Sequence, residues 1–130
     1  MAAQPPVPSA QTILVVEDED AILNILTYSL SSQTYAVLGA RSGAEARAAV
    51  AGHAGAIHLL VTDVHLPDVG GPQLAQALQA LLPGLKVLYL SGYPLATLVR
   101  DGKLAGGEPF LHKPFSPAGF VRKVRDTLGP

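Results

Sequence analysis

Side chains with acidic, hydroxyl or amine groups stand directly at the ends of short apolar runs in this chain. They are spread over almost the whole sequence: Glu17, Asp18, Asp63, Ser91 and Lys113. A carboxylate at the mouth of a buried strand is costly unless a charged group meets it. If the apolar runs are neighbouring parallel strands, acids, a hydroxyl and an amine meet at one edge of a sheet. Such a set could hold a divalent cation and a phosphoryl group.

The acids in this set predict a site for Mg²⁺ or Mn²⁺. Carboxylates within a few ångströms repel one another, and a hard cation with oxygen ligands removes the repulsion. We expect Asp18 and Asp63 to be direct ligands, with Glu17 acting beside them through water. Helix capping is the alternative explanation of the acids that follow the first run, but capping accounts for one acid only, and Glu19 fits that role best.

Asp63 is the candidate nucleophile, because a carboxylate can attack phosphorus and form an acyl phosphate while a cation screens the charges. Lys113 could pair with Asp63 or with a phosphoryl oxygen; the alternative is a surface lysine before a turn. Ser91 could donate to a second phosphoryl oxygen or cap the following helix. His65, two residues beyond Asp63, should overhang the site, and its backbone carbonyl could reach the cation.

Apolar periodicity predicts that strands and helices alternate along the chain. We expect strands over residues 12–16, 35–39, 58–62, 86–90 and 109–112. A capping box from Ser42 to Glu45 opens the second helix, and Ser116 followed by Pro117 opens the last. This alternation favours a parallel sheet with helices on both faces, and ligands of such sheets bind beyond the carboxyl ends of the strands.

The composition excludes several classes of protein. A length of 130 residues and a hydrophobic fraction of 48% suit one domain with a large core. No apolar run approaches the roughly 18 residues of a membrane span, so we expect no membrane insertion. A net charge of −1, with acids and bases intermixed, argues against nucleic-acid binding. The absence of cysteine excludes disulfides and thiolate chemistry, and fits a cytoplasmic location.

The first residues differ from the rest of the chain. Pro5, Pro6 and Pro8 indicate an extended leader or linker over residues 1–11, which lacks the pattern of a signal peptide. We expect residues 12–130 to form the folded domain.

The ordered motifs resemble the receiver domain of two-component response regulators. The resemblance rests on Val15-Val16-Glu17-Asp18-Glu19, Thr62-Asp63-Val64-His65-Leu66-Pro67 with Gly71, Leu90-Ser91-Gly92 and Lys113-Pro114-Phe115. It covers nearly everything from Thr12 to Leu128. It implies a doubly wound, five-stranded parallel sheet of order 2-1-3-4-5 with five helices, the flavodoxin-like receiver fold. It also implies a signalling domain that catalyses only its own phosphorylation and dephosphorylation, rather than an enzyme.

The same resemblance implies a donor and a metal site. Asp63 would accept a phosphoryl group from a phosphohistidine on a histidine kinase or histidine phosphotransfer domain. Asp18, Asp63 and the backbone carbonyl of His65 would bind Mg²⁺, with Glu17 beside them. Glu17 stands where Asp is commoner in the family; Glu also occurs there, so we keep it in the metal site.

A switch is implied as well. Ser91 and Lys113 would read the phosphoryl group, and the rotamer of Phe110 would follow, altering the surface of the fourth helix, fifth strand and fifth helix, where an output partner binds. The bond before Pro114 would be cis, as it usually is in the family. Ser91 replaces a frequent Thr, and Phe110 lacks the hydroxyl that a Tyr would bring.

His65 and Tyr93 occupy two positions that vary in the family and tune the loss of phosphate. Both are bulky, so we expect them to screen water from the site. Two other functions stay open: a pseudo-receiver that binds partners without phosphorylation, and an aspartyl-nucleophile phosphatase, although His65 stands where the phosphatase needs a second acid. The stretch from Tyr89 to Tyr93 and the proline-rich leader resemble the receivers of hybrid histidine kinases.

Overall fold

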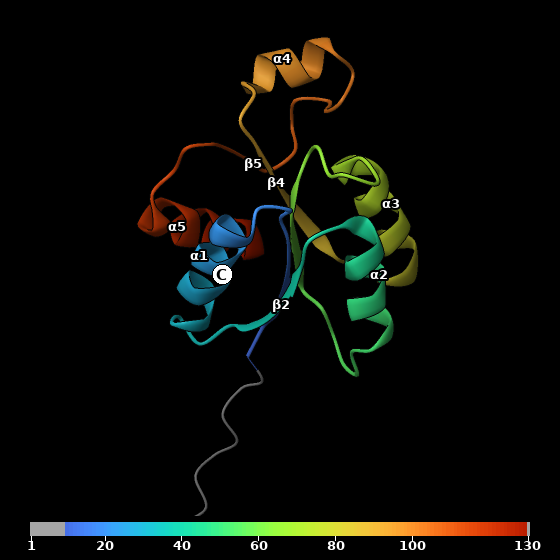
Figure 1. The fold of residues 1–130 in the computed structure, drawn as a ribbon, viewed down its shortest axis with the longest axis vertical. Helices are drawn as coiled ribbons and strands as arrows, with labels where there is room; N and C mark the ends of the chain where they lie inside the picture. Colours follow the sequence, from blue (N-terminus) through green and yellow to red (C-terminus); the bar gives the residue numbers. More distant parts are fainter. Residues whose placement is uncertain (1–9, 130) are drawn as a thin grey trace, which may run out of the picture.

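Strands and helices alternate strictly along the chain in the computed structural model, which describes residues 10–129 (Figure 1). The strands are β1 (Thr12–Val16), β2 (Ala36–Ala40), β3 (Leu59–Asp63), β4 (Lys86–Ser91) and β5 (Phe110–His112). The helices are α1 (Asp20–Ser31), α2 (Gly43–Ala51), α3 (Gly71–Leu81), α4 (Leu95–Arg100) and α5 (Pro117–Leu128). The predicted alternation is confirmed. The leader predicted over residues 1–11 falls mainly outside the described residues.

All neighbouring strands of the sheet run parallel, in the order β2-β1-β3-β4-β5. The doubly wound fold and its strand order are therefore confirmed. In Figure 1, α1 and α5 lie together on one side of the sheet and α2 and α3 on the other, while α4 stands apart from these helices. Because parallel strands point the same way, their carboxyl ends share one edge.

Two apolar cores flank the sheet, because successive residues of a strand point to opposite faces. On β1, Ile13 and Val15 face the core under α1 and α5, whereas Leu14 and Val16 face the core under α2 and α3. The helices complete the first core with Leu23, Leu26, Leu30, Phe120, Val124 and Leu128. Every residue of β1 and β3 is buried, so the centre of the sheet is a rigid base for the side chains at its edge.

Four strands differ by one residue from the predicted bounds. β2 begins and ends one residue later, β3 runs over Leu59–Asp63 instead of 58–62, β4 extends to Ser91, and β5 begins at Phe110. Strand ends are decided by pairing with neighbours, which a single sequence does not show: Asp63 pairs with Leu90, and Ser91 with His112. Two predicted site residues are therefore the last residues of strands and not the first residues of loops.

The predicted helix starts are correct, with one change of partner. Ser42 accepts a hydrogen bond from the backbone N–H of Glu45 at 3.1 Å. The Glu45 carboxylate accepts from the backbone N–H of Arg41 at 3.1 Å, instead of the Ser42 N–H of a standard capping box. Ser116 caps α5 by accepting from the Gly119 N–H at 3.0 Å. Within residues 10–129, no helix has the length and apolar character needed to cross a bilayer.

Candidate functional site

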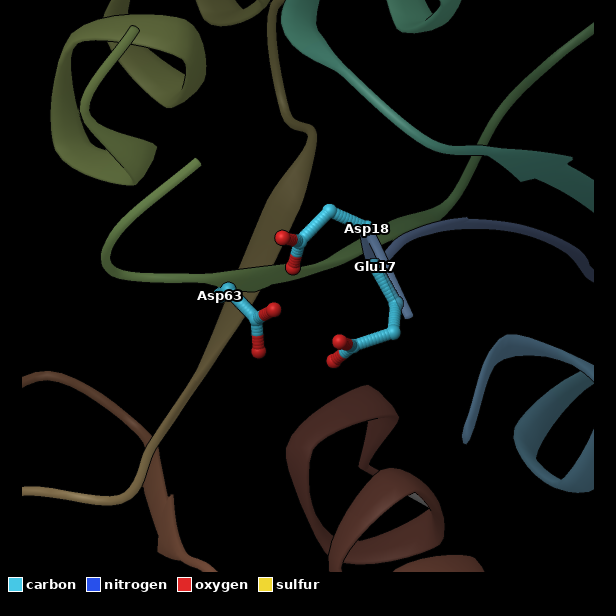
Figure 2. Close-up of side chains that lie close together, drawn as sticks. All are labelled: Glu17, Asp18 and Asp63. Carbon is cyan, nitrogen blue, oxygen red and sulfur yellow. The ribbon is translucent and has the colours of Figure 1, made fainter. Parts of the chain in front are cut away.

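Three carboxylates from two strand ends meet at the carboxyl edge of the sheet (Figure 2). Glu17 and Asp18 follow β1, and Asp63 ends β3. One oxygen of each carboxylate lies within 4.8 Å of the others. Because Mg²⁺ holds its ligands at about 2.1 Å, two ligands on opposite sides of the ion are about 4.2 Å apart. The trio is therefore close to the spacing that a single hard cation requires.

The three acids differ in burial. Glu17 is fully buried and Asp63 is 6% exposed, whereas Asp18 is open to solvent. The pKa of the Asp63 carboxyl is raised to about 8: burial is the largest cause, Glu17 adds to the rise, and Lys113 opposes it. Asp63 would therefore hold a proton at neutral pH unless further positive charge stabilises its carboxylate.

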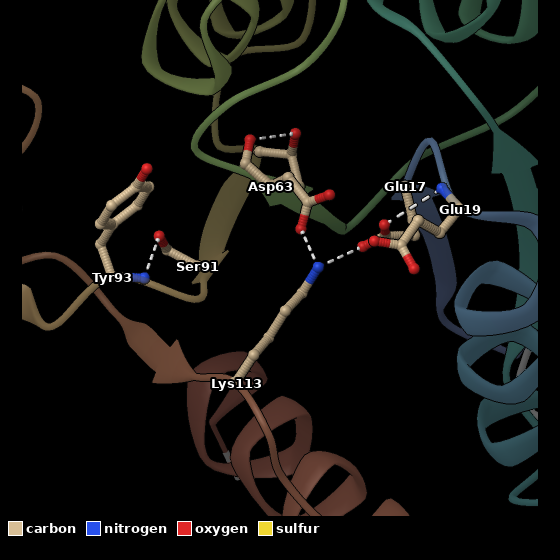
Figure 3. A network of polar contacts seen from close by, with 7 residues as sticks. Glu17, Glu19, Asp63, Ser91, Tyr93 and Lys113 are labelled. Carbon is tan, nitrogen blue, oxygen red and sulfur yellow. Dashed lines mark hydrogen bonds and ion pairs between the residues drawn. The ribbon is translucent and has the colours of Figure 1, made fainter.

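The ammonium of Lys113 lies between the two buried acids (Figure 3). It donates to Glu17 Oε2 at 2.8 Å and lies 2.9 Å from Asp63 Oδ1. Burial lowers the pKa of this ammonium, but its bonds to Glu17 and Asp63 outweigh burial and raise the pKa above its ordinary value. The lysine is therefore charged and neutralises part of the acidic cluster.

The Asp63 Oδ1 atom is buried, and its polar contact is the ion pair with the ammonium of Lys113, 2.9 Å away. A carboxylate has about four lone-pair sites, so Asp63 could bind an ion as well as the lysine. Carboxylate oxygens are also the donors that Mg²⁺ and Mn²⁺ prefer. The side chains of Glu17, Asp18 and Asp63 therefore fit such a cation in both their spacing and their donor atoms.

Glu17 also holds the start of α1. Its Oε1 accepts from the backbone N–H of Glu19 at 3.2 Å. Glu19 occupies the N-cap position, as predicted, but its own side chain makes no capping bond. It lines the pocket described next instead.

A pocket of about 190 Å³ opens at Asp63. Its lining residues are Asp18, Glu19, Asp63, His65, Leu90, Ser91, Gly92, Tyr93 and Lys113. The rings of His65 and Tyr93 meet edge to face in its wall, with centroids 5.5 Å apart. The structure thus brings together most residues that the sequence predicted for the site. Glu17 lies beneath this surface, fully buried.

Ser91 lines this pocket, whereas Phe110 is not among the lining residues. Ser91 is buried, and its hydroxyl oxygen accepts from the backbone N–H of Tyr93 at 3.0 Å (Figure 3). It does not cap α4, whose N-cap residue is Pro94. Phe110 is half-buried on β5 and packs against the core under α2 and α3. The peptide bond between Lys113 and Pro114 is cis.

Two supporting residues follow Asp63 in the chain. The Asp68 carboxylate accepts from the backbone N–H groups of Gly43 and Ala44, both at 2.9 Å, and these bonds lower its pKa. Gly71 lies so close to Asp63 that a Cβ atom would overlap the Asp63 backbone carbonyl oxygen. Sequence reasoning named Gly71 only as part of a motif and overlooked Asp68, because an acid in a loop carries no signal of its partner.

Comparison with known proteins gives close matches over most of the chain. A family model for the response regulator receiver domain matches residues 13–125. Sensor kinase CckA of Brucella abortus (strain 2308) is 34% identical over 117 residues, which cover 90% of this chain and 12% of that protein. Transcriptional regulatory protein CreB of Escherichia coli (strain K12) is 33% identical over 122 residues, covering 91% of this chain and 51% of CreB. The chain thus spans about half, or less, of the length of these relatives.

Solved structures match the fold. The crystal structure of the receiver domain from hybrid histidine kinase CckA has a TM-score of 0.74 at 33% identity, covering 90% of this chain and 98% of that one. Chemotaxis response regulator CheY4 of Vibrio cholerae has a TM-score of 0.78 at 23% identity, covering 91% and 98%. The second likeness concerns the fold alone.

Proposed function

Because the chain belongs to the response regulator receiver domain family, we propose that it accepts a phosphoryl group on Asp63 within a two-component phosphorelay. The donor is a phosphohistidine on a histidine kinase or a histidine phosphotransfer domain, which implies a cytoplasmic location. The observation that carries the proposal is the position of Asp63, a strand-end carboxylate that opens into a pocket beside Lys113 and two further acids. The proposal concerns the receiver alone, since its relatives include a sensor kinase and transcriptional regulators.

The transfer breaks the P–N bond of the phosphohistidine and forms a P–O bond to Asp63. The leaving imidazole keeps the electron pair of the broken bond and takes up a proton from solvent. Asp63 must attack as a carboxylate, so groups that oppose its raised pKa favour the reaction. Lys113 is one such group, because its ammonium lies 2.9 Å from Oδ1. It would also face an oxygen of the incoming phosphoryl group.

The carboxylates of Glu17, Asp18 and Asp63 would hold Mg²⁺ or Mn²⁺, with the backbone carbonyl of His65 as a further ligand. When bound, the cation supplies the positive charge that screens the attacking carboxylate from the phosphoryl oxygens. The spacing of the three carboxylates, with one oxygen of each within 4.8 Å of the others, supports this assignment.

Ser91 and Lys113 would respond to the new phosphoryl oxygens. The Ser91 oxygen accepts from the Tyr93 N–H, so its own proton remains available to donate to a phosphoryl oxygen. A shift of Ser91 would let Phe110 turn inward and alter the surface of α4, β5 and α5, where we expect an output partner. The change is a shift of population between two states, and its size is set by the difference in their contacts.

Incubation with acetyl phosphate and Mg²⁺, followed by intact mass measurement, tests the proposal. We expect one phosphoryl adduct that is lost in Asp63→Asn and in EDTA. Asp68→Asn is the matched control, since Asp68 lies in the next loop and binds α2 instead of the site, and it should keep the adduct. Turnover of small phosphoesters would indicate a phosphatase instead. The absence of an adduct with acetyl phosphate and with a phosphohistidine donor would indicate a pseudo-receiver.

A further inference from the structure

His112, the last residue of β5, holds the loop that follows β4. Its Nε2 lies 3.0 Å from the backbone carbonyl oxygen of Gly92. A carbonyl oxygen only accepts hydrogen bonds, so Nε2 carries the proton and donates. The backbone pairing of β4 with β5 ends one step earlier, where the Lys113 N–H donates to the Ser91 carbonyl at 2.8 Å. The imidazole therefore extends the pairing of the two strands by one residue, beyond the end of β4.

The same imidazole contacts the predicted switch aromatic. The rings of His112 and Phe110 stack with centroids 6.5 Å apart and planes inclined by 20°. The two residues lie on the same side of β5, because side chains of a strand alternate. His112 is thus in contact both with the loop that carries Ser91 and with the aromatic ring proposed to follow Ser91.

The loop over residues 92–94 has few other anchors. A Cβ atom at Gly92 would meet no atom within 4 Å, and the other anchors are at Tyr93, whose N–H donates to the Ser91 hydroxyl of β4 and whose ring meets that of His65. The loop leads into α4, which stands apart from the other helices in Figure 1 and reaches the core through the buried Leu98. The bond from His112 therefore holds Gly92 two residues before the N-cap of α4.

We propose that His112 is a positioning residue of the phosphorylation switch: its bond to Gly92 and its stacking on Phe110 favour the unphosphorylated arrangement. The proposal rests on the proposed function of Asp63. Movement of Ser91 toward a phosphoryl oxygen carries the adjoining Gly92 carbonyl away from Nε2, and the Phe110 ring is released together with the imidazole. A net hydrogen bond of this kind corresponds to roughly a two- to tenfold bias in the equilibrium between the two arrangements.

Two substitutions separate the hydrogen bond from the stacked ring. His112→Phe keeps an aromatic ring and loses the donor. His112→Gln loses the ring but brings an amide N–H to nearly the position of Nε2. Because His112 is exposed, both variants should fold, and their urea unfolding midpoints check this. Beryllofluoride with Mg²⁺ serves as the probe, since it occupies the place of a phosphoryl group on a carboxylate.

We expect His112→Phe to bind beryllofluoride roughly two- to tenfold more tightly than the wild type. The Gly92 and Tyr93 amide resonances of the free variant should move toward those of the beryllofluoride complex. His112→Gln should lie closer to the wild type than His112→Phe in both affinity and resonances, because it keeps the donor and loses only the ring. Rescue by glutamine would assign the effect to the donated hydrogen bond.

Two failures are distinguishable. If the wild type forms the Asp63 adduct but His112→Phe changes neither the affinity nor the resonances, the role of His112 is wrong and the proposed function stands. If the wild type binds no beryllofluoride and forms no adduct, the proposed function fails, and the role of His112 fails with it, because there is no switch to position.

Discussion

The ammonium of Lys113 donates to the fully buried carboxylate of Glu17 at 2.8 Å, and this bond joins the residues that follow β5 and β1. In the sheet, β3 and β4 lie between those two strands. The bond therefore crosses the carboxyl edge beside Asp63, whose Oδ1 lies 2.9 Å from the same ammonium. Glu17 thus fixes the position of the lysine as well as contributing a potential ligand for a cation.

Glu17→Ala should lower the free energy of unfolding in EDTA by about 1–3 kcal/mol. Lys113 loses the acceptor of its hydrogen bond, and the removed side chain leaves a buried cavity. The cost stays below that of a fully buried pair, because the lysine side chain is 22% exposed and can turn to water. Urea titration measures the change. Glu19→Ala, which removes an exposed acid without a capping bond, should change stability by less than about 0.5 kcal/mol. Equal effects of the two substitutions would contradict this role of Glu17.

The stability of the metal-free protein should depend on the ionisation of Asp63. Its pKa is raised to about 8 in the folded protein, so the folded state binds this proton more tightly than the unfolded chain does. The resulting stabilisation is complete below the unfolded pKa, near 4, and is lost as the pH rises to about 8. In EDTA, the free energy of unfolding of the wild type should therefore fall relative to that of Asp63→Asn as the pH rises from 5.5 to 8.5. Urea titrations at several pH values measure this difference.

Mg²⁺ should reverse this trend. A cation binds the deprotonated carboxylate, so Mg²⁺ should raise the melting temperature more at pH 8.5 than at pH 5.5. Asp63→Asn should lose most of this gain. A difference between wild type and Asp63→Asn that does not vary with pH, with or without Mg²⁺, would show that the Asp63 carboxyl does not titrate in this range.

Gly71→Ala should destabilise the protein by roughly 1–3 kcal/mol and slow formation of the phosphoryl adduct. The added Cβ atom would overlap the Asp63 backbone carbonyl oxygen, so the end of β3 would have to move. Gly107→Ala is the control, because a Cβ atom there would meet nothing within 4 Å. Urea titration and the rate of adduct formation give the two measurements. If Gly71→Ala is destabilised but forms the adduct at an unchanged rate, Gly71 supports the fold and not the phosphorylation of Asp63.

The fold was largely predictable because its signals are local or ordered along the chain. The run over residues 13–16 is fully buried in β1, as a continuous apolar run indicates. The strand order came from the family resemblance and is confirmed by the pairing of the strands. Single residues at strand ends were less predictable, since the inclusion of Asp63 in β3 depends on its pairing with Leu90.

The partners of the site residues were harder to predict. Sequence reasoning paired Lys113 with Asp63 or a phosphoryl oxygen, and the structure has the ion pair with Asp63 at 2.9 Å; the hydrogen bond to Glu17, 96 residues away, was not predicted. His112 has no metal-type spacing to other histidines, so its role could not be recognised from sequence. Its bond to Gly92 follows from the register of β4 and β5, which aligns Ser91 with His112. Such contacts depend on three-dimensional register and side-chain reach, and neither is encoded locally.

The paired rings of His65 and Tyr93 should slow the loss of phosphate from Asp63. They meet edge to face in the wall of the Asp63 pocket, where water must enter to hydrolyse the acyl phosphate. The double variant His65→Ala and Tyr93→Ala should therefore lose its adduct roughly two- to tenfold faster, equivalent to about 0.4–1.4 kcal/mol in the barrier. Intact mass measurements after removal of acetyl phosphate give the decay rate.

Tyr28→Ala is the control for this last prediction, since Tyr28 is 75% exposed on α1 and does not line the pocket. Each single variant should show a smaller effect than the double variant, because either remaining ring still covers part of the pocket. Unchanged decay in the double variant would mean that water reaches the acyl phosphate by another route. Faster decay in Tyr28→Ala as well would point to a general loosening of the protein, whereas an effect confined to the two pocket residues assigns the protection to their rings.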